Sequence, residues 1–209
     1  MLLTSQGVTA DYNNMAPSEQ LILASSSVHR RALLERLRLP FRCHAPGIDE
    51  TPEPGEAPSA LVERLALAKA RAVAWFYPQA LIIGSDEVAA LDGRIFPKPA
   101  DHAEALHQIE AMSGREVEFL TGVCLLNNRT GRHQLDTVTV QVRFRQMTQA
   151  AIRRYLDNDK PYDCAGSFRS EAGGITLVHR ISSADNTALL GLPLIALQEM
   201  LRNEGYEIP

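Results

Sequence analysis

Apolar and polar positions alternate in blocks that predict strands and helices in turn. The first block is a short apolar run, Leu21–Leu23, which predicts a strand. After a turn of serines, leucines at positions 33, 34 and 37 form the apolar stripe of an amphipathic helix, and any of the serines 25 to 27 could cap it. Phe41–Ala45 alternates as a strand does, and the four prolines and two glycines of residues 46–58 predict a loop.

A long helix and a buried strand are expected next. Ser59 is placed to cap a helix from Ala60 to about Trp75. Lys69 lies beside the apolar face of this helix, where a lysine either extends its ammonium to water or points into a cleft. Ala80–Gly84 is a continuous apolar run, which is typical of a strand covered on both faces.

The second half of the chain predicts hairpins and further helices. A two-residue Asp-Gly turn at positions 92 and 93 favours a hairpin, and two longer segments joined by residues 127–131 predict an antiparallel pair. The glycine-rich residues 163–174 form an irregular segment of a length that usually marks a binding element or disorder. The expected strands are Val88–Leu91, Arg94–Phe96, Arg115–Leu126, Leu135–Phe144 and Ile175–Ile181, and the expected helices run from Asp101 to Met112, from a Thr148 cap to about Leu156, and from Pro193 to Arg202.

Composition limits the class of protein. The 209 residues fit one domain, which can have two lobes, and 45% hydrophobic with 22% charged residues is ordinary for a globular protein. A formal net charge of −4 argues against a nucleic-acid-binding protein. Three scattered cysteines without metal-ligand spacing suit reduced, buried thiols in a cytosol, and no apolar run reaches the about 18 residues that span a bilayer.

The first 19 residues differ from the rest of the chain. They are polar, lack a periodic apolar face, and lack the basic-then-apolar layout of a signal peptide. We expect a flexible extension at residues 1–19 ahead of a single domain at residues 20–209. Both Met1 and Met15 are candidate start sites.

The junction between the first strand and the first helix is a candidate anion site. Free backbone N–H groups at a helix start, the hydroxyls of Ser25 and Ser27, and the guanidinium groups of Arg30 and Arg31 suit a phosphate. The alternative is a solvated basic helix face, and Arg31 has Glu35 four residues later as an ion-pair partner.

Three further segments carry candidate chemistry. Glu50 follows a predicted strand within an acidic loop, and Asp86 and Glu87 directly follow the buried strand, where open α/β sheets bind their ligands. Lys98 stands between two prolines, which restrict its backbone more than a solvated lysine requires. Glu50 and Asp86 are hard oxygen ligands suited to Mg²⁺ or Mn²⁺, and either could instead activate water as a general base.

Taken together, these segments resemble the Maf family of nucleotide pyrophosphatases. The resemblance extends in order and at matching spacing from about Leu21 to the end of the chain. Its strongest likeness is to the branch assigned to 7-methylguanosine triphosphate. The matching segments are residues 23–31, Asp49-Glu50, Lys69-Ala70, Gly84-Ser85-Asp86, Lys98-Pro99, residues 165–171 and Gly191-Leu192-Pro193-Leu194.

The resemblance implies both a fold and an activity. The implied fold is an elongated, two-lobed α/β domain with a mixed twisted sheet, flanking helices and a deep cleft. The implied protein is a cytoplasmic, often dimeric enzyme that uses a divalent cation (Mg²⁺, Mn²⁺ or Co²⁺) to split a nucleoside triphosphate between its α- and β-phosphates. By position, Asp86 is the proton acceptor, and Ser25, Arg30, Glu50, Lys69 and Lys98 match other active-site residues.

Two positions depart from the family pattern and concern the base. His29, after Val28, stands where the family has tryptophan or arginine after proline, and Glu87 stands where the methylguanosine branch has glutamine. Glu171 matches a third position linked with base choice, so two carboxylates near the base would favour a cationic methylated purine. The alternatives are a pyrophosphatase for UTP, dTTP or many substrates, and a non-catalytic nucleotide-binding protein linked to cell division.

Overall fold

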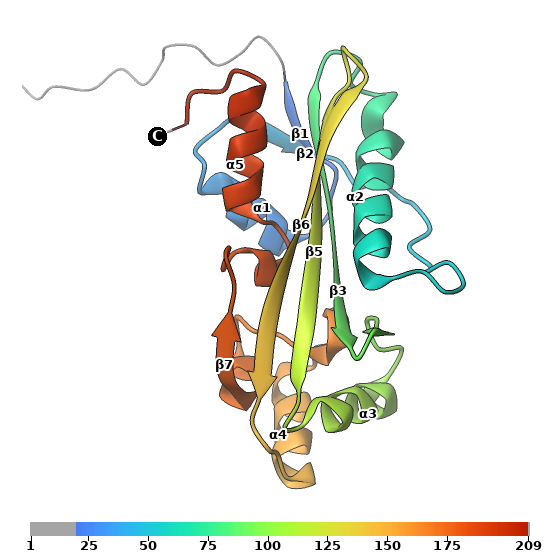
Figure 1. The fold of residues 1–209 in the computed structure, drawn as a ribbon, viewed down its shortest axis with the longest axis vertical. Helices are drawn as coiled ribbons and strands as arrows, with labels where there is room; N and C mark the ends of the chain where they lie inside the picture. Colours follow the sequence, from blue (N-terminus) through green and yellow to red (C-terminus); the bar gives the residue numbers. More distant parts are fainter. Residues whose placement is uncertain (1–19, 209) are drawn as a thin grey trace, which may run out of the picture.

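Three long antiparallel strands form the axis of the molecule in the computed structural model, which describes residues 20–208 (Figure 1). They are β3 (Leu81–Leu91), β5 (Glu116–Asn127) and β6 (Arg132–Phe144), and β5 pairs with both neighbours along nearly its whole length. Because the three strands run through both halves of the molecule, the fold is elongated.

Shorter strands extend this axis on each side. β1 (Leu21–Leu23) lies parallel to β3 and to the edge strand β2 (Phe41–Cys43), whereas β7 (Val178–Ser182) pairs antiparallel with β6. β4 (Arg94–Phe96) pairs only with the last residues of β3. Within residues 20–208 this gives an open seven-stranded mixed sheet in the order β2-β1-β3-β5-β6-β7, with β4 off that path.

Alternate residues of β1 and β3 face different helices. Leu21, Leu23 and Ile83 pack with leucines of α1 (Val28–Glu35) and α5 (Leu194–Asn203). Ile22 and Ile82 point the other way, onto alanines of α2 (Pro58–Ala74). Figure 1 shows α1 and α5 on one side of the sheet and α2 on the other.

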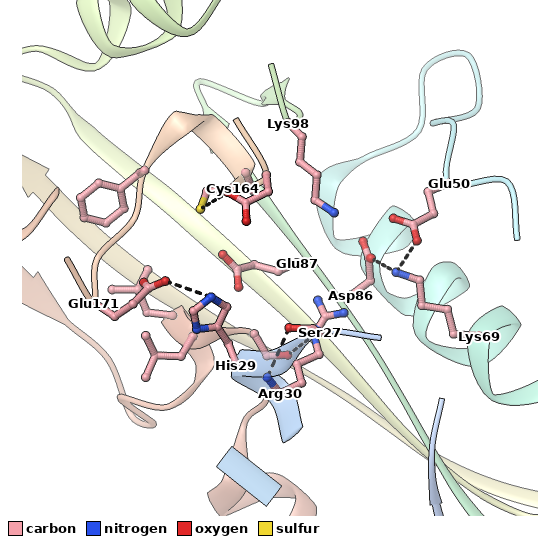
Figure 2. A pocket seen from close by; sticks show the side chains of 16 residues that line it. Ser27, His29, Arg30, Glu50, Lys69, Asp86, Glu87, Lys98, Cys164 and Glu171 are labelled. Atoms are coloured by element: carbon pink, nitrogen blue, oxygen red, sulfur yellow. Dashed lines mark hydrogen bonds and ion pairs between the residues drawn. The ribbon is translucent and has the colours of Figure 1, made fainter. Parts of the chain in front are cut away.

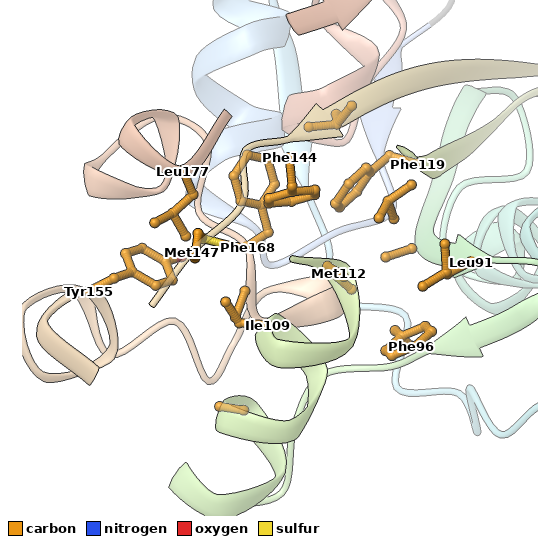
Figure 3. Packing of buried hydrophobic residues seen from close by; sticks show 14 of the residues in the cluster. Leu91, Phe96, Ile109, Met112, Phe119, Phe144, Met147, Tyr155, Phe168 and Leu177 are labelled. Atoms are coloured by element: carbon orange, nitrogen blue, oxygen red, sulfur yellow. The ribbon is translucent and has the colours of Figure 1, made fainter. Parts of the chain in front are cut away.

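The other end of the long strands has its own core. The helices α3 (His102–Met112) and α4 (Gln149–Asp159) cover it. Phe168 packs against Phe119 and Phe144, with ring centroids 5.3 and 5.1 Å away (Figure 3). The predicted fold, an elongated α/β domain with a mixed sheet, two lobes and flanking helices, is confirmed.

Two glycines let α2 lie unusually close to the sheet. A Cβ atom at Gly84 of β3 would collide with the Ala66 carbonyl oxygen, and one at Gly122 of β5 would collide with that of Val62. Gly122 lies directly opposite Asp86 in the strand register. α2 is therefore close enough to the sheet for its side chains to reach hydrogen-bonding distance of Asp86.

Several element boundaries differ from the sequence prediction. Ala57, not Ser59, is the N-cap residue of α2, because Pro58 occupies the first helical turn, where its fixed φ angle and missing N–H are tolerated. The two predicted strands 80–84 and 88–91 form one continuous strand, β3. The polar residues between them do not interrupt it, because β5 satisfies the backbone along its length.

Other predictions are confirmed or shifted slightly. Ser27, Asp101 and Thr148 cap α1, α3 and α4 through their side-chain oxygens, and Asp92 and Gly93 have the positive φ angles of the expected turn. β7 begins at Val178 rather than residue 175, since Gly173–Leu177 forms a 3₁₀ turn, and another occurs at Ala165–Ser167.

Two further predictions concern membrane-spanning helices and the N-terminal segment. No helix within residues 20–208 is long and apolar enough to cross a bilayer. The predicted flexible extension at residues 1–19 lies outside the described residues.

Candidate active site

A cavity opens along the edge of β3 where that strand has no neighbour. β1 ends at Leu23, opposite Ile83, and β4 pairs only with residues 89–91, so one edge of the segment between them is uncovered. Asp86 and Glu87 lie in this segment and point to opposite sides of the strand (Figure 2). The prediction that Asp86 follows the end of its strand is wrong; the strand that ends here is β1.

Six separate segments contribute side chains to the cavity. They are the start of α1, the loop before α2, α2 itself, β3, the Lys98 segment and the region from residue 163 to residue 191 (Figure 2). Nine of the predicted site residues line it: Ser27, His29, Arg30, Glu50, Lys69, Asp86, Glu87, Lys98 and Glu171.

The first part of the cavity is a lysine–carboxylate cluster made of Lys69, Glu50 and Asp86. The Lys69 ammonium lies 2.6 Å from Asp86 Oδ1 and 2.8 Å from Glu50 Oε1, and Lys69 is only 4% exposed. Burial acts to raise the pKa of Glu50, but the hydrogen bond from Lys69 and the charges of Lys98 and Arg30 outweigh it and lower that pKa. The cluster thus holds an ammonium and two carboxylates in contact.

Two more cations face the same space. Lys98 extends toward the cluster from the opposite wall (Figure 2), and its ammonium makes no ion pair within residues 20–208. Arg30 donates from Nε to the Gly191 carbonyl oxygen at 2.7 Å, which fixes its guanidinium group at the cavity wall. Gly191 has a φ of +93°, and a Cβ there would lie 3.1 Å from Arg30 Nε, so glycine suits both the turn and the contact.

The second part of the cavity is a glutamate–histidine face made of Glu87, His29 and Glu171. Burial raises the pKa of Glu87 to about 8; Arg30 acts to lower that pKa, while the carboxylates of Asp86 and Glu171 add to the rise. His29 Nε2 lies 3.4 Å from Glu171 Oε1, and both side chains are partly exposed. Glu87 is therefore largely a neutral acid at pH 7.

Two predicted site residues lie outside the cavity lining. Ser25 is buried, and its hydroxyl accepts a hydrogen bond from the Ser27 N–H at 3.1 Å, so it shapes the turn that precedes α1. Arg31 is exposed and pairs with Glu35 at 3.1 Å, the alternative that its i,i+4 spacing offers.

Some cavity residues were not singled out from the sequence. Cys164 and Phe168 come from the irregular segment, for which the sequence left a binding element and disorder as alternatives and assigned no role to these side chains. Leu189, Leu190 and Gly191 belong to a short 3₁₀ turn and its end. Apolar residues in such a turn give no local signal, and only the family motif at Gly191 marked this region.

The carboxylates present fit a divalent cation only in part. No group of three or more histidine, cysteine, aspartate or glutamate side chains within residues 20–208 is arranged to hold a metal ion. Glu50 and Asp86 together supply two carboxylates on one cavity wall. Mg²⁺ commonly binds through one or two carboxylates plus substrate phosphates, so this pair fits a cation that arrives with a phosphorylated ligand.

Comparison with known proteins gives consistent matches over nearly the whole described chain. Residues 20–204 match the family model described as Maf-like protein. The chain is 53% identical over 189 residues to the 7-methyl-GTP pyrophosphatase of Pseudomonas savastanoi pv. phaseolicola, which covers 90% of this chain and 98% of the relative. It is 52% identical over 190 residues to the protein of the same name from Aromatoleum aromaticum, with 91% and 98% covered.

Proposed function

Because the chain belongs to the Maf-like protein family, we propose that it is a nucleoside triphosphate pyrophosphatase that converts 7-methyl-GTP to its monophosphate and pyrophosphate. The family model matches residues 20–204, which include every segment that lines the cavity, and the relatives named 7-methyl-GTP pyrophosphatase are aligned over 90% of the chain.

One observation carries the activity: cations and carboxylates from segments far apart in sequence meet at one cavity. Lys69, Lys98 and Arg30 come from α2, the proline-flanked segment and α1. A triphosphate repels an incoming water oxygen until its negative charge is balanced, and fixed cations supply that balance. The three cations are therefore the expected binding partners of the triphosphate.

Asp86 is the proposed proton acceptor. Water adds to a phosphorus atom of the α–β anhydride, the bond from that phosphorus to the bridging oxygen breaks, and the proton of the water passes to the Asp86 carboxylate. Lys69 donates a hydrogen bond to Asp86 at 2.6 Å and holds its carboxylate in the cavity. The charge that develops on the departing oxygen faces the cations.

A divalent cation is a further part of the proposal. Glu50 and Asp86 would hold it together with the phosphates, and when bound it would neutralise phosphate charge. In the structure Lys69 donates to one oxygen of each of these carboxylates. The Lys69 ammonium therefore holds Glu50 and Asp86 in position.

The glutamate–histidine face is the proposed site for the base. Phe168, Leu189 and Leu190 line the cavity near it and offer apolar contact to a purine. With a pKa of about 8, Glu87 is mostly protonated before a ligand binds, so it can donate a hydrogen bond to a purine oxygen. A cationic 7-methylpurine would favour the ionised form of Glu87, whereas the neutral guanine of GTP would not.

An alternative substrate follows from the same face. His29 offers a smaller stacking surface than an aromatic indole, and a protonated Glu87 does not by itself select a cationic base. A pyrimidine triphosphate such as UTP or dTTP is therefore the second candidate. A cytoplasmic location and a homodimer remain parts of the proposal that rest on family resemblance.

A panel of nucleoside triphosphates tests the proposed function. Pyrophosphate release from 7-methyl-GTP, GTP, UTP, dTTP and ATP is measured with Mg²⁺, Mn²⁺ or Co²⁺, and with a chelator. We expect the highest kcat/KM for 7-methyl-GTP and loss of activity with the chelator. A preference for UTP or dTTP would contradict the assignment of 7-methyl-GTP as the substrate. Absence of pyrophosphate release from every nucleotide would contradict the proposed pyrophosphatase activity.

A further inference from the structure

Gln108 is a buried amide that contacts two cavity walls at once. It lies on α3, outside the cavity lining, and is only 5% exposed. Its Nε2 donates to the Pro97 carbonyl oxygen at 3.1 Å, and its Oε1 accepts from the Ser167 hydroxyl at 2.6 Å. Both ends of the amide are thus used, each by a different segment of the chain.

The first contact fixes the segment that carries Lys98. Pro97 directly precedes Lys98, and its carbonyl also accepts from the Gly166 N–H at 3.3 Å. On the other side of the lysine, the Ala100 N–H donates to Glu104 Oε2 at 2.7 Å. Because Glu104 and Gln108 are one helical turn apart, α3 holds the backbone on both sides of Lys98.

The second contact fixes the segment that leads to Glu171. Ser167 is fully buried and has a φ of 55°, a conformation that serine adopts only when its surroundings hold it there. The next residue, Phe168, lines the cavity. The segment has a second attachment, since Tyr155 Oη donates to the Ser167 carbonyl at 3.0 Å and accepts from the Arg169 N–H at 2.9 Å.

We propose that Gln108 is a positioning residue that sets the distance between Lys98 and the wall formed by residues 163–171. The inference rests on the proposed function, in which Lys98 binds phosphate and that wall contacts the base. A buried amide that loses its hydrogen-bond partners lowers the stability of the folded protein. The two contacts of Gln108 are therefore kept unless the site opens. The spacing between the phosphate-binding and base-binding walls is therefore set by this side chain together with the direct hydrogen bond from the Gly166 N–H to the Pro97 carbonyl.

Two variants separate the two contacts. Gln108→Met keeps the length of the side chain and removes both contacts, together with a longer one of 3.5 Å from Gln108 Nε2 to Glu104 Oε1, whereas Ser167→Ala removes only the contact to the base wall. The matched control is Asn128→Leu, which removes another partly buried amide that donates to two backbone carbonyls, those of Ala74 and Tyr77. This control lies outside the cavity lining.

The products give binding readouts that do not depend on turnover. Calorimetry measures the affinity for pyrophosphate and for 7-methyl-GMP, beside kcat, KM and Tm. In Gln108→Met we expect about tenfold weaker pyrophosphate binding and about tenfold lower kcat, because small displacements of a positioning group carry costs of this size. In Ser167→Ala we expect several-fold weaker 7-methyl-GMP binding, because the base wall loses one of its attachments, while pyrophosphate affinity stays at the wild-type value, because Gln108 still donates to the Pro97 carbonyl.

The control separates positioning from general loss of stability. Asn128→Leu should lower Tm while both affinities and kcat stay at the wild-type values. The inference is overturned if Gln108→Met binds pyrophosphate as tightly as wild type, if Ser167→Ala weakens both products in equal proportion, or if the control reproduces the loss. A wild-type protein that binds both products but releases no pyrophosphate contradicts the proposed function alone, and the affinity comparisons still decide the role of Gln108.

Discussion

The lysine–carboxylate cluster and the glutamate–histidine face share one cavity but are built differently. In the cluster, Lys69 and Asp86 project from the middle of α2 and β3, are almost fully buried and lie 2.6 Å apart. In the face, His29 comes from the first turn of a helix and Glu171 from an irregular segment, and their partly exposed side chains approach only to 3.4 Å.

This difference indicates which part of the site tolerates change. A buried contact between regular elements cannot be altered without repacking α2 on the sheet, where Gly84 leaves no room for a side chain. The partly exposed pair of His29 and Glu171, at a helix start and in an irregular segment, can be altered at little cost to the fold. Of the two positions that depart from the expected family pattern, His29 belongs to this pair, whereas Glu87 lies on β3 beside Asp86.

The largest expected effect comes from the cluster. Asp86→Asn keeps the shape of the side chain and removes its charge and its capacity to accept a proton. We expect kcat to fall by about 100-fold or more, as is common on removal of a positioned acid–base group. Steady-state pyrophosphate release measures it, and circular dichroism at the assay temperature is the control that the variant is folded. Near-full activity in a clean preparation would show that the cluster is structural.

The next effect concerns stability at the face. Because burial raises the pKa of Glu87 from 4.5 to about 8, the folded protein keeps a proton that the unfolded chain loses, and wild-type stability falls as pH rises through this interval. The Glu87→Gln variant has no carboxyl group at this position and does not lose this stability as pH rises. Its stability advantage over wild type should grow by up to about 4 kcal/mol between pH 4.5 and pH 8, since each unit of pKa shift corresponds to about 1.4 kcal/mol.

Urea unfolding at several pH values measures this difference. Glu171→Gln is the matched control, because Glu171 is partly exposed and should show a much weaker trend. A difference that does not vary with pH would mean that Glu87 is ionised in the folded protein at neutral pH and that burial does not raise its pKa.

A smaller effect concerns base discrimination. Removing one carboxylate from the face should narrow the preference for 7-methyl-GTP over GTP by about fivefold, because the attraction of a partly desolvated carboxylate for a cation is offset by its lost hydration. The ratio of kcat/KM values in wild type, Glu87→Gln and Glu171→Gln measures it. If neither substitution lowers the ratio of kcat/KM for 7-methyl-GTP to kcat/KM for GTP, the glutamate–histidine face does not distinguish a cationic base from a neutral one.

The smallest effect is expected away from both regions. The sequence of residues 1–16 has no periodic apolar face, so deleting them should leave Tm and kcat unchanged. Thermal unfolding and steady-state kinetics of the shortened chain, beginning at Pro17, provide the measurement. A loss of several degrees would indicate that this segment packs on the domain.

The sequence by itself determined the types of most elements and the residues capable of chemistry. The apolar runs and capping side chains predict elements locally, because side-chain periodicity and N-cap hydrogen bonds involve residues only a few positions apart. Lys69, Asp86 and Lys98 stood out for the same reason: a charge beside a buried face or between prolines is unusual wherever it occurs. The role of Arg31 could not be separated from that of Arg30 on these grounds.

Only the tertiary structure decided which of these residues meet. Lys69 contacts Asp86 because glycines in β3 and β5 let α2 approach the sheet, and Asp86 and Glu87 share a cavity because β1 stops before β3 does. Gln108 and Ser167 are 59 residues apart; Gln108 gave no sequence signal, and Ser167 was marked only as part of the family segment 165–171. Close approach between distant segments depends on how whole elements pack, and packing sums many weak contacts that no local pattern encodes.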